Sequence, residues 1–341
     1  MNDMTSSCDA DVAIIGAGPV GLFAVFECGM LRMKCHVFDT LDMVGGQCAA
    51  LYPEKPIYDI PGHPAIDGAA LVERLSDQIA PFHPVFHLAQ QVMRIERLAD
   101  GRWELATDRG TMVRARAVIV AAGVGAFGPN RPPLDGIEEY EGRSVFYLVR
   151  RREDFRGKRV VIAGGGDSAV DWAIALAEVA AQVMVIHRRP KFRAAPESAA
   201  RLAALADSGR IELVVPYQLH ALEGEAGMLS GVVVADLDGG TRVLPADALL
   251  PFFGLSMQLG PIAEWGLALD FHHVRIDPST AATNLPGIFA IGDIATYPGK
   301  LKLILTGFAE AAQAAHAIHP LVHPGEALHF EYSTSKGVTA L

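Results

Sequence analysis

A glycine-rich turn followed by an acidic residue is the first feature of this sequence that could carry chemistry. Residues 16–21 read Gly-Ala-Gly-Pro-Val-Gly and follow a short predicted strand, Asp11–Ile15. Glycines at this spacing let the backbone turn tightly and approach a pyrophosphate, which the N–H groups of the next helix bind. Asp39 stands 18 residues after Gly21, where a carboxylate suits a ribose hydroxyl. The candidate nucleotide contacts in this segment are Gly16, Gly18, Val20, Gly21 and Asp39.

The same arrangement occurs a second time, but with basic residues in place of the acid. Residues 164–169 read Gly-Gly-Gly-Asp-Ser-Ala and follow a predicted strand at 159–163. The next predicted strand, 183–186, runs into His-Arg-Arg-Pro-Lys-Phe-Arg at 187–193. Arginines at this position bind a 2′-phosphate through charge-assisted hydrogen bonds, whereas an acid would repel it; a solvated basic loop is the alternative. The second set of candidate contacts is Gly164, Gly166, Asp167, Ser168, Ala169, His187, Arg188, Arg189 and Arg193.

These two segments predict two cofactors and a particular domain order. The first site is expected to take FAD and the second NADPH rather than NADH. Residues 283–293 then read as a strand ending in Gly-Asp, and Asp293 could bind the ribitol chain of a flavin. The predicted fold is therefore α/β, with two Rossmann-like domains of the three-layer ββα type and the NADPH domain inserted into the FAD domain. We expect residues 1–123 and 254–341 to form the FAD domain and 124–253 the NADPH domain.

The cysteines and the composition limit the other possibilities. Cys8, Cys28, Cys35 and Cys48 are the only cysteines, and no two form C-x-x-C. Free thiols in a reducing cytoplasm are therefore expected, without a metal site. The net charge of -10 opposes binding to nucleic acid, and the apolar runs are too short to span a membrane. The Ala-rich stretch Leu301–His316 is predicted to be a helix.

The order of the motifs resembles a known group of flavoenzymes. GAGPVG, VIVAAG, GGGDSAVDWA, HRRPKFRA and GIFAIGD occur in the order found in low-molecular-weight thioredoxin reductases. Those enzymes carry a C-x-x-C disulfide just before the second glycine motif, whereas Tyr140–Lys158 contains no cysteine here. The stretches GGQCAALYPEKPIYD, GAFGPNRP and EYSTSKG are instead similar to the thioredoxin-reductase-like ferredoxin–NADP reductases, and this resemblance covers the whole chain.

This resemblance implies an activity and a set of flavin contacts. Hydride would pass between NADPH and FAD, and single electrons between FAD and ferredoxin or flavodoxin. No redox disulfide and no proton-transferring side chain would be needed. A homodimer is implied, with a C-terminal tail, 328–341, that covers the flavin. The implied FAD contacts are Gln47, Tyr52, Val92, Phe127, Asp293 and Thr334, with Tyr52 and Tyr332 stacking on the ring.

Two other functions stay open at this point. A disulfide reductase would use Cys48 with a second cysteine, but Pro53 occupies the place five residues later that glutathione-reductase-type enzymes give to that cysteine. Cys48 is therefore expected to be a small buried side chain beneath the flavin. The other alternative is a non-catalytic flavoprotein that senses NADPH. If ferredoxin is the partner, the basic groups expected to steer it are Arg150, Arg151, Arg152, Lys300, Lys302 and Lys336.

Overall fold

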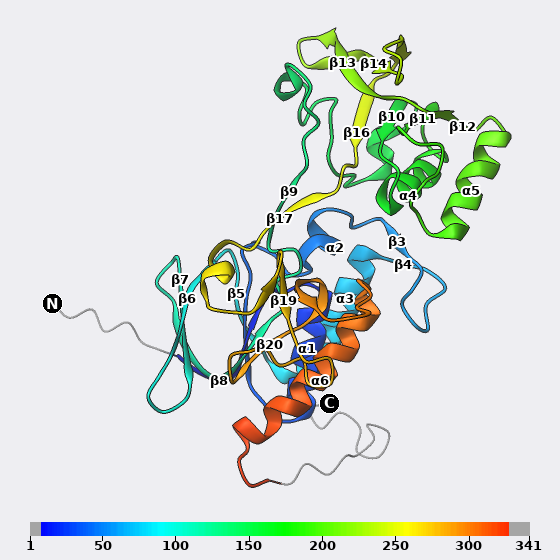
Figure 1. The fold of residues 1–341 in the computed structure, drawn as a ribbon. Coiled ribbons are helices and arrows are strands. Elements are labelled where there is room, and N and C mark those ends of the chain that lie inside the picture. Colours follow the sequence, from blue (N-terminus) through cyan, green and yellow to red (C-terminus); the bar gives the residue numbers. More distant parts are fainter. Residues whose placement is uncertain (1–7, 327–341) are drawn as a thin grey trace. The chain divides into compact units, whose positions relative to one another are not determined.

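The computed structural model describes residues 8–326, except for the side chains of residues 126–129 and 255–257. The chain divides into two compact units (Figure 1). The first unit combines the chain up to Phe127 with the chain from Met257 onward, and the second comprises Gly128–Ser256. Both boundaries fall inside short strands, β9 (Ala126–Pro129) and β17 (Leu255–Gln258), which pair with each other.

The first unit is built on a sheet whose order is β5-β2-β1-β8-β7-β6, with β20 beside β8. Its parallel centre is buried on both faces, so the strand segments Val12–Ile15 and Ala117–Val120 are almost entirely apolar. The parallel strands are β1 (Cys8–Ile15), β2 (Cys35–Phe38), β5 (Val85–His87), β8 (Met112–Val120) and β20 (Ile288–Ala290), and the antiparallel ones are β6 (Val92–Arg97) and β7 (Trp103–Thr107).

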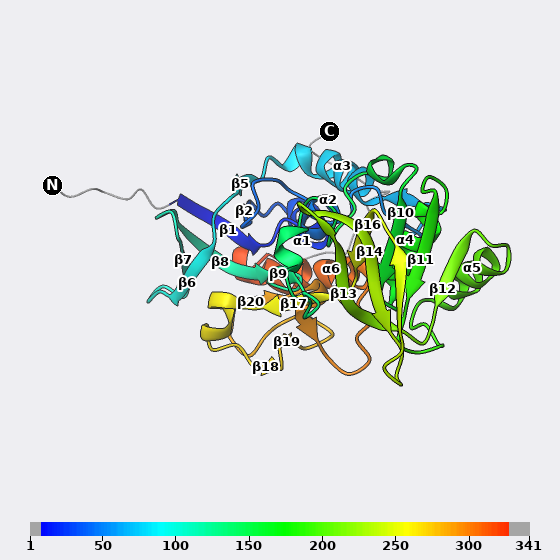
Figure 2. The ribbon, with the colours of Figure 1, turned by 90° about the horizontal axis from the view of Figure 1, so that it is seen from above.

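Three helices cover one face of this sheet: α1 (Pro19–Met30), α3 (Gly68–Ile79) and α6 (Ile304–Val322) (Figures 1 and 2). Helix α1 is apolar around most of its circumference because it contacts both α3 and α6 as well as the sheet. The opposite face is covered by a second apolar cluster that includes Leu259, Ile262 and Ile294. The sheet therefore lies between two packed layers, as the sequence predicts.

Helix α6 differs from the predicted helix, Leu301–His316, at both ends. It begins three residues later because Leu303 has an extended backbone, with φ -121° and ψ 147°. It continues past His316 because Ile318 and Val322 are buried in the helical core of the unit. Pro320 lies inside the helix and does not end it.

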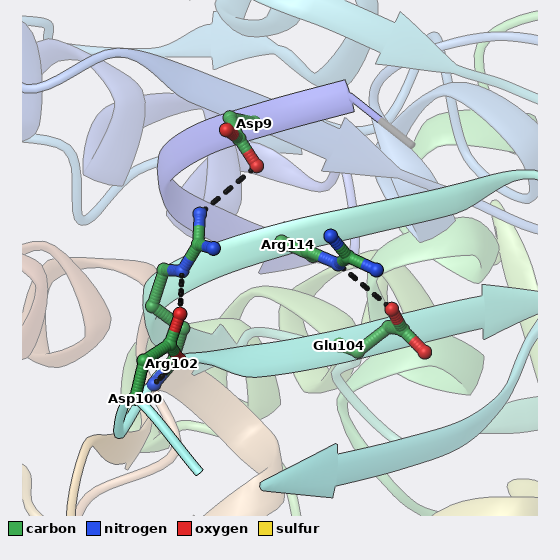
Figure 3. A network of polar contacts seen from close by, with 5 residues as sticks. All are labelled: Asp9, Asp100, Arg102, Glu104 and Arg114. Carbon is green, nitrogen blue, oxygen red and sulfur yellow. Dashed lines mark hydrogen bonds and ion pairs between the residues drawn. The ribbon is translucent and has the colours of Figure 1, made fainter. Parts of the chain in front are cut away.

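Ion pairs tie the antiparallel strands to the start of β1 (Figure 3). The guanidinium of Arg102 contacts Asp9 at 3.1 Å and Asp100 at 2.8 Å. Arg114 pairs with Glu104 at 2.9 Å, directly across the β7–β8 register. Partly exposed pairs contribute little stability, so their main consequence is to fix this register.

The second unit repeats the same plan on a smaller scale. Its parallel sheet has the order β12-β11-β10-β16, and a three-stranded antiparallel sheet, β13-β14-β15, packs on it through a shared apolar core. Strand β10 has the predicted bounds, and β11 begins one residue before the predicted start. The elements are β10 (Arg159–Ala163), α4 (Asp167–Leu176), β11 (Gln182–Ile186), α5 (Pro196–Asp207), β12 (Ile211–Val214), β13 (Gln218–Glu225), β14 (Met228–Ala235), β15 (Thr241–Pro245) and β16 (Ala248–Pro251).

Short elements complete the two units. Across residues 8–326 no helix is long and apolar enough to cross a membrane. The remaining strands and helices are α2 (Gly46–Ala50), β3 (Pro56–Ile57), β4 (Ile66–Asp67), β18 (Leu269–Asp270), β19 (His273–Arg275), β21 (Ala295–Thr296) and the 3₁₀ turns Ala80–Phe82, Ile137–Glu139, Arg152–Phe155, Gly260–Glu264 and Gly292–Ile294.

Candidate cofactor sites

A cavity in the first unit lies where β1, β2, β8 and β20 end. The carboxyl ends of parallel strands are where α/β folds bind nucleotides, because the loops there can diverge around a ligand. Most of the FAD contacts expected from the sequence line this one cavity. They are Gly16, Gly18, Val20, Asp39, Gln47, Tyr52, Val92 and Asp293.

The glycines of the first turn have two different physical roles. Gly16 and Gly21 are required by packing, because an added Cβ would lie 2.3 Å from the oxygen of Ala121 at Gly16 and 1.9 Å from the oxygen of Gly16 at Gly21. A Cβ on Gly18 would meet nothing within 4 Å. Gly18 is also the N-cap of α1, so its backbone lies open to the cavity beside the helix N-terminus. This arrangement fits a pyrophosphate.

Asp39 ties this turn to the end of β2. Its Oδ2 accepts a hydrogen bond of 2.7 Å from the backbone N–H of Ala17, and its Oδ1 accepts one of 2.9 Å from that of Leu41. Burial raises the pKa of Asp39, and the backbone N–H groups oppose that shift. A carboxylate has about four acceptor positions, so the group can still bind a ribose hydroxyl. The shorter side chain of Asp, compared with Glu, is sufficient to reach the turn.

Cys48 and Tyr52 lie on and just after the short helix α2. Cys48 is 2% exposed, and its Sγ lies 3.9 Å from the hydroxyl of Tyr52. Burial raises the pKa of the Cys48 thiol to about 11. Because the thiolate is the reactive form, a thiol of this kind is a poor nucleophile at neutral pH. Tyr52 and Gln47 line the cavity from the same segment.

Asp293 reaches the cavity from the turn that follows β20. The turn is possible because Gly292 has a φ of +73°, a conformation that L side chains rarely adopt. Asp293 is half-buried and lines the cavity, next to Gly292, which lies beside Val20 in the first turn of α1. The cavity thus combines an open helix N-terminus, a carboxylate at the end of β2 and a second carboxylate beyond β20. This donor and acceptor set fits the pyrophosphate, ribose and ribitol of FAD.

The glycine turn of the second unit has the same construction. A Cβ on Gly164 would lie 2.6 Å from the oxygen of Phe252, whereas a Cβ on Gly166 would meet nothing within 4 Å. Ala169, in the place of the third glycine, is fully buried. Helix α4 begins directly after Gly166, so its N-terminal N–H groups are again beside an open stretch of backbone. Asp167 accepts a hydrogen bond of 2.8 Å from the backbone N–H of Ala195, and Ser168 is exposed.

The basic segment after β11 lies beside this turn. The backbone N–H of Arg193 donates to the oxygen of Gly165 at 2.6 Å, and Arg188, Arg189 and Arg193 are all exposed. His187 differs from them because it is buried and its ring packs on Gly165, where an added Cβ would lie 2.3 Å from the ring. Burial, and then the charge of Arg193, lower the pKa of His187. The structure therefore gives His187 a packing role against the turn, whereas the three arginines are exposed.

The structure does not place the remaining predicted FAD contacts along the cavity wall. Gly21 packs behind the turn, and Phe127 belongs to β9, where side chains are not described. Tyr332 and Thr334 lie outside residues 8–326. The cavity also has lining residues that the sequence analysis missed. They include Gln90, Gln91, Leu259, Pro261, Ile262 and Trp265, and these come from segments with no nucleotide motif.

The prediction that Lys300 helps to dock an acidic partner is wrong. The side chain of Lys300 is 4% exposed and forms an ion pair with Glu310, so it is not available to an acidic partner. Arg151 and Arg152 are themselves paired, with Asp154 at 3.2 Å and Glu178 at 3.5 Å. Lys302 is exposed, although its ammonium contacts His273 at 2.8 Å. Lys336 lies beyond residue 326, outside the described part of the chain.

Two dinucleotide turns on two Rossmann-like units, one with a carboxylate and one with arginines, define a protein that binds two different dinucleotides. The chain belongs to the pyridine nucleotide-disulphide oxidoreductase family, whose model matches residues 10–317. Membership of this family, together with the relatives described next, makes it an oxidoreductase that uses FAD and NADPH.

Similar proteins indicate which group within this family the chain most resembles. The chain is 68% identical over 330 residues to a ferredoxin–NADP reductase of Paramagnetospirillum magneticum, covering 97% of this chain and 98% of that protein. It is 67% identical over 333 residues to a ferredoxin–NADP reductase of Granulibacter bethesdensis, covering 97% and 94%. Among solved structures, thioredoxin reductase of Lactococcus lactis is 25% identical with a TM-score of 0.79, covering 92% of this chain and 99% of that chain.

Proposed function

We propose that the protein is a ferredoxin–NADP reductase that passes electrons between NADPH and ferredoxin through FAD, without a redox disulfide. The relatives named above support this activity. The distribution of the cysteines is the observation that supports electron transfer without a redox disulfide. The unit Gly128–Ser256 contains none, and Cys48, which lines the FAD cavity, is a buried thiol whose pKa is raised to about 11 by burial. The thioredoxin-reductase fold is therefore used here without its disulfide.

The side chains of this protein would bind and orient the cofactors. Bound FAD supplies the one chemical property needed, since it accepts a hydride and releases electrons singly. Gly18 and the N-terminus of α1 bind its pyrophosphate, Asp39 its ribose and Asp293 its ribitol. Gln47 contacts the ring and Tyr52 stacks on it. None of these residues transfers a proton or forms a covalent bond, so we assign no catalytic acid, base or nucleophile.

The basic segment of the second unit would select NADPH over NADH. Arg188, Arg189 and Arg193 are exposed beside the glycine turn at Gly166, with no carboxylate partner among residues 8–326. Unpaired guanidinium groups at the ribose-binding position bind a 2′-phosphate well. This supports NADPH, and it disfavours a basic loop that serves only solubility.

We also propose flavodoxin as the alternative acceptor and a homodimer as the assembly, and we propose that the tail 328–341, which lies outside the described residues, covers the flavin with Tyr332 and Thr334. The cytoplasm is the proposed location, which is supported by four free cysteines, three of them buried. Size-exclusion chromatography with light scattering tests the dimer, and a tail truncation at residue 327 tests the cover.

Turnover with purified redox partners tests the proposed activity. We expect NADPH to reduce cytochrome c rapidly only when ferredoxin is added, and we expect no turnover of oxidised thioredoxin. Thioredoxin turnover would revive the disulfide-reductase alternative. Slow reduction of every acceptor, with NADPH bound, would favour the sensing flavoprotein instead. Diaphorase activity with dyes is not informative because many flavoenzymes show it.

Replacing Cys48 with serine is expected to change ferredoxin-dependent turnover by less than about threefold. Tyr52→Ala should weaken FAD binding by up to about tenfold, because ring stacking contributes about 0.5–1.5 kcal/mol beyond the buried area. Tyr52→Phe, which keeps the ring but loses the hydroxyl that faces Cys48, is the matched control. Equilibrium titration of apoprotein with FAD, followed by steady-state assays, measures both. An inactive Cys48→Ser enzyme that still holds FAD would contradict the thiol-free account.

A further inference from the structure

A buried carboxylate lies directly behind the turn that carries Asp293. It belongs to Glu310 on α6, which is 2% exposed. Its Oε2 accepts a hydrogen bond of 2.8 Å from the backbone N–H of Gly292. Its Oε1 accepts one of 2.9 Å from the hydroxyl of Tyr297 and also pairs with the ammonium of Lys300. All three donors belong to the segment that connects β20 to α6.

In this network the buried ammonium of Lys300 and the buried carboxylate of Glu310 neutralise each other. The side chains of Lys300 and Glu310 are 4% and 2% exposed. A buried ion pair adds little net stability over apolar residues of the same volume, but losing one partner is costly. The physical consequence of such a pair is therefore to fix one conformation of the chain between residues 292 and 300. That stretch includes Asp293 and leads to Ile304, and both line the FAD cavity.

Helix α6 also approaches this turn closely enough for Glu310 to act on it. Gly307, one helical turn before Glu310, faces α1 and the turn. A Cβ on Gly307 would lie 2.4 Å from Cγ2 of Val20 and 3.3 Å from Cα of Gly292. Val20 is in the first turn of α1, beside the open backbone of Gly18. Helix α6 therefore contacts both segments: Glu310 binds the turn that follows β20, and Gly307 lies against that turn and the first turn of α1.

We propose that Glu310 is a positioning residue for the flavin: by holding Gly292 and Lys300, it keeps the Asp293 carboxylate directed into the FAD cavity. The inference rests on the placement of FAD proposed above. Glu310 touches no cofactor itself, so its effect should be seen in FAD affinity and in the flavin environment. Helix α6 is thus more than a layer that packs on the sheet.

Two double variants separate the hydrogen bond to Gly292 from the ion pair. Glu310→Gln with Lys300→Met removes both charges but keeps an acceptor for the Gly292 N–H. Glu310→Leu with Lys300→Met removes the charges and the acceptor. We expect the first to bind FAD within about threefold of the wild type and the second about tenfold more weakly, which corresponds to about 1.4 kcal/mol. The visible circular dichroism of the bound flavin should change only in the second.

Binding of FAD to the apoproteins is the readout, with thermal unfolding of the same apoproteins as the control. Wild-type FAD affinity and flavin dichroism in the folded Leu/Met variant would overturn the proposal. A lower melting temperature with an unchanged flavin spectrum would also overturn it, because the role would then be structural only. If the Leu/Met variant does not fold, Glu310→Met with Lys300→Met takes its place, because methionine also lacks an acceptor for the Gly292 N–H and is unbranched like Glu. An FAD affinity equal to that of the Gln/Met variant would then contradict the proposal.

Asp293→Asn separates this inference from the proposed function. It should weaken FAD binding, since the turn supplies a direct contact. If it does so but the Leu/Met variant does not, Glu310 has no positioning role and the FAD site stands. If Asp293→Asn binds FAD like the wild type, the inferred role of Glu310 is wrong together with this contact. Ferredoxin-dependent turnover is measured separately. If the wild-type protein shows none, the proposed function is wrong, whatever the role of Glu310.

Discussion

Replacing both Arg188 and Arg189 with alanine is expected to lower kcat/KM for NADPH about 100-fold and to leave kcat/KM for NADH within about threefold. Each substitution would remove a hydrogen bond to the charged 2′-phosphate, and each such bond stabilises bound NADPH by about 1.5–3 kcal/mol. A loss of about 3 kcal/mol corresponds to roughly two powers of ten in rate. NADH lacks the phosphate, so its kcat/KM should not depend on these side chains.

Arg201→Ala is the matched control for this prediction. Arg201 is an exposed arginine of the same unit, on α5 rather than in the basic segment. Its loss changes the net charge without removing a group at the ribose-binding position. Steady-state kinetics with both nucleotides and a saturating acceptor give the ratio. An equal fall for NADPH and NADH in the arginine variant would mean that the segment acts by general electrostatics or by structure.

The second large effect is expected at the first glycine turn, where alanine substitutions at two nearby glycines should have different consequences. Gly18→Ala should fold normally, because the added Cβ meets no protein atom within 4 Å. It should nevertheless weaken FAD binding by at least about tenfold, since the methyl group occupies the space where the pyrophosphate approaches the backbone. Gly21→Ala should damage the fold itself, because its Cβ would lie 1.9 Å from the oxygen of Gly16.

Thermal unfolding and FAD titration of the apoproteins separate the two outcomes. The melting temperature of Gly18→Ala should match the wild type, and that of Gly21→Ala should fall by on the order of 10 °C, as expected for about 3 kcal/mol in a unit of this size. Gly166→Ala, the corresponding open position of the second unit, is the control and should spare FAD while weakening NADPH. Normal FAD affinity in Gly18→Ala would show that the cavity does not hold the pyrophosphate there.

The features that could be predicted from the sequence are those with a local cause. The strand, glycine turn and helix around Gly16 and Gly164 are each set by residues within about thirty positions, as the fingerprint requires. The basic segment after β11 follows from the same spacing. Cys48 is buried as expected, because it lies in a short apolar helix directly after a turn.

The features that could not be predicted depend on contacts between distant segments. Nothing in the residues near Trp265 shows that they line the same cavity as Gly16, because the chain returns to the first unit only after the second. Lys300 follows a Pro-Gly turn, which is typical of an exposed loop, and its partner Glu310 is an isolated acid in an Ala-rich helix. A buried charge pair of this kind leaves no periodic pattern.

The central claim, that the flavin is the only redox centre, is tested most directly by anaerobic titration of the purified protein with NADPH or dithionite. If no disulfide takes part, full reduction should consume about one two-electron equivalent per bound FAD, and ferredoxin should then reoxidise the protein completely. An enzyme with a redox disulfide would take up about two such equivalents. One equivalent is the result that this account predicts, and reproducible uptake of two would contradict it.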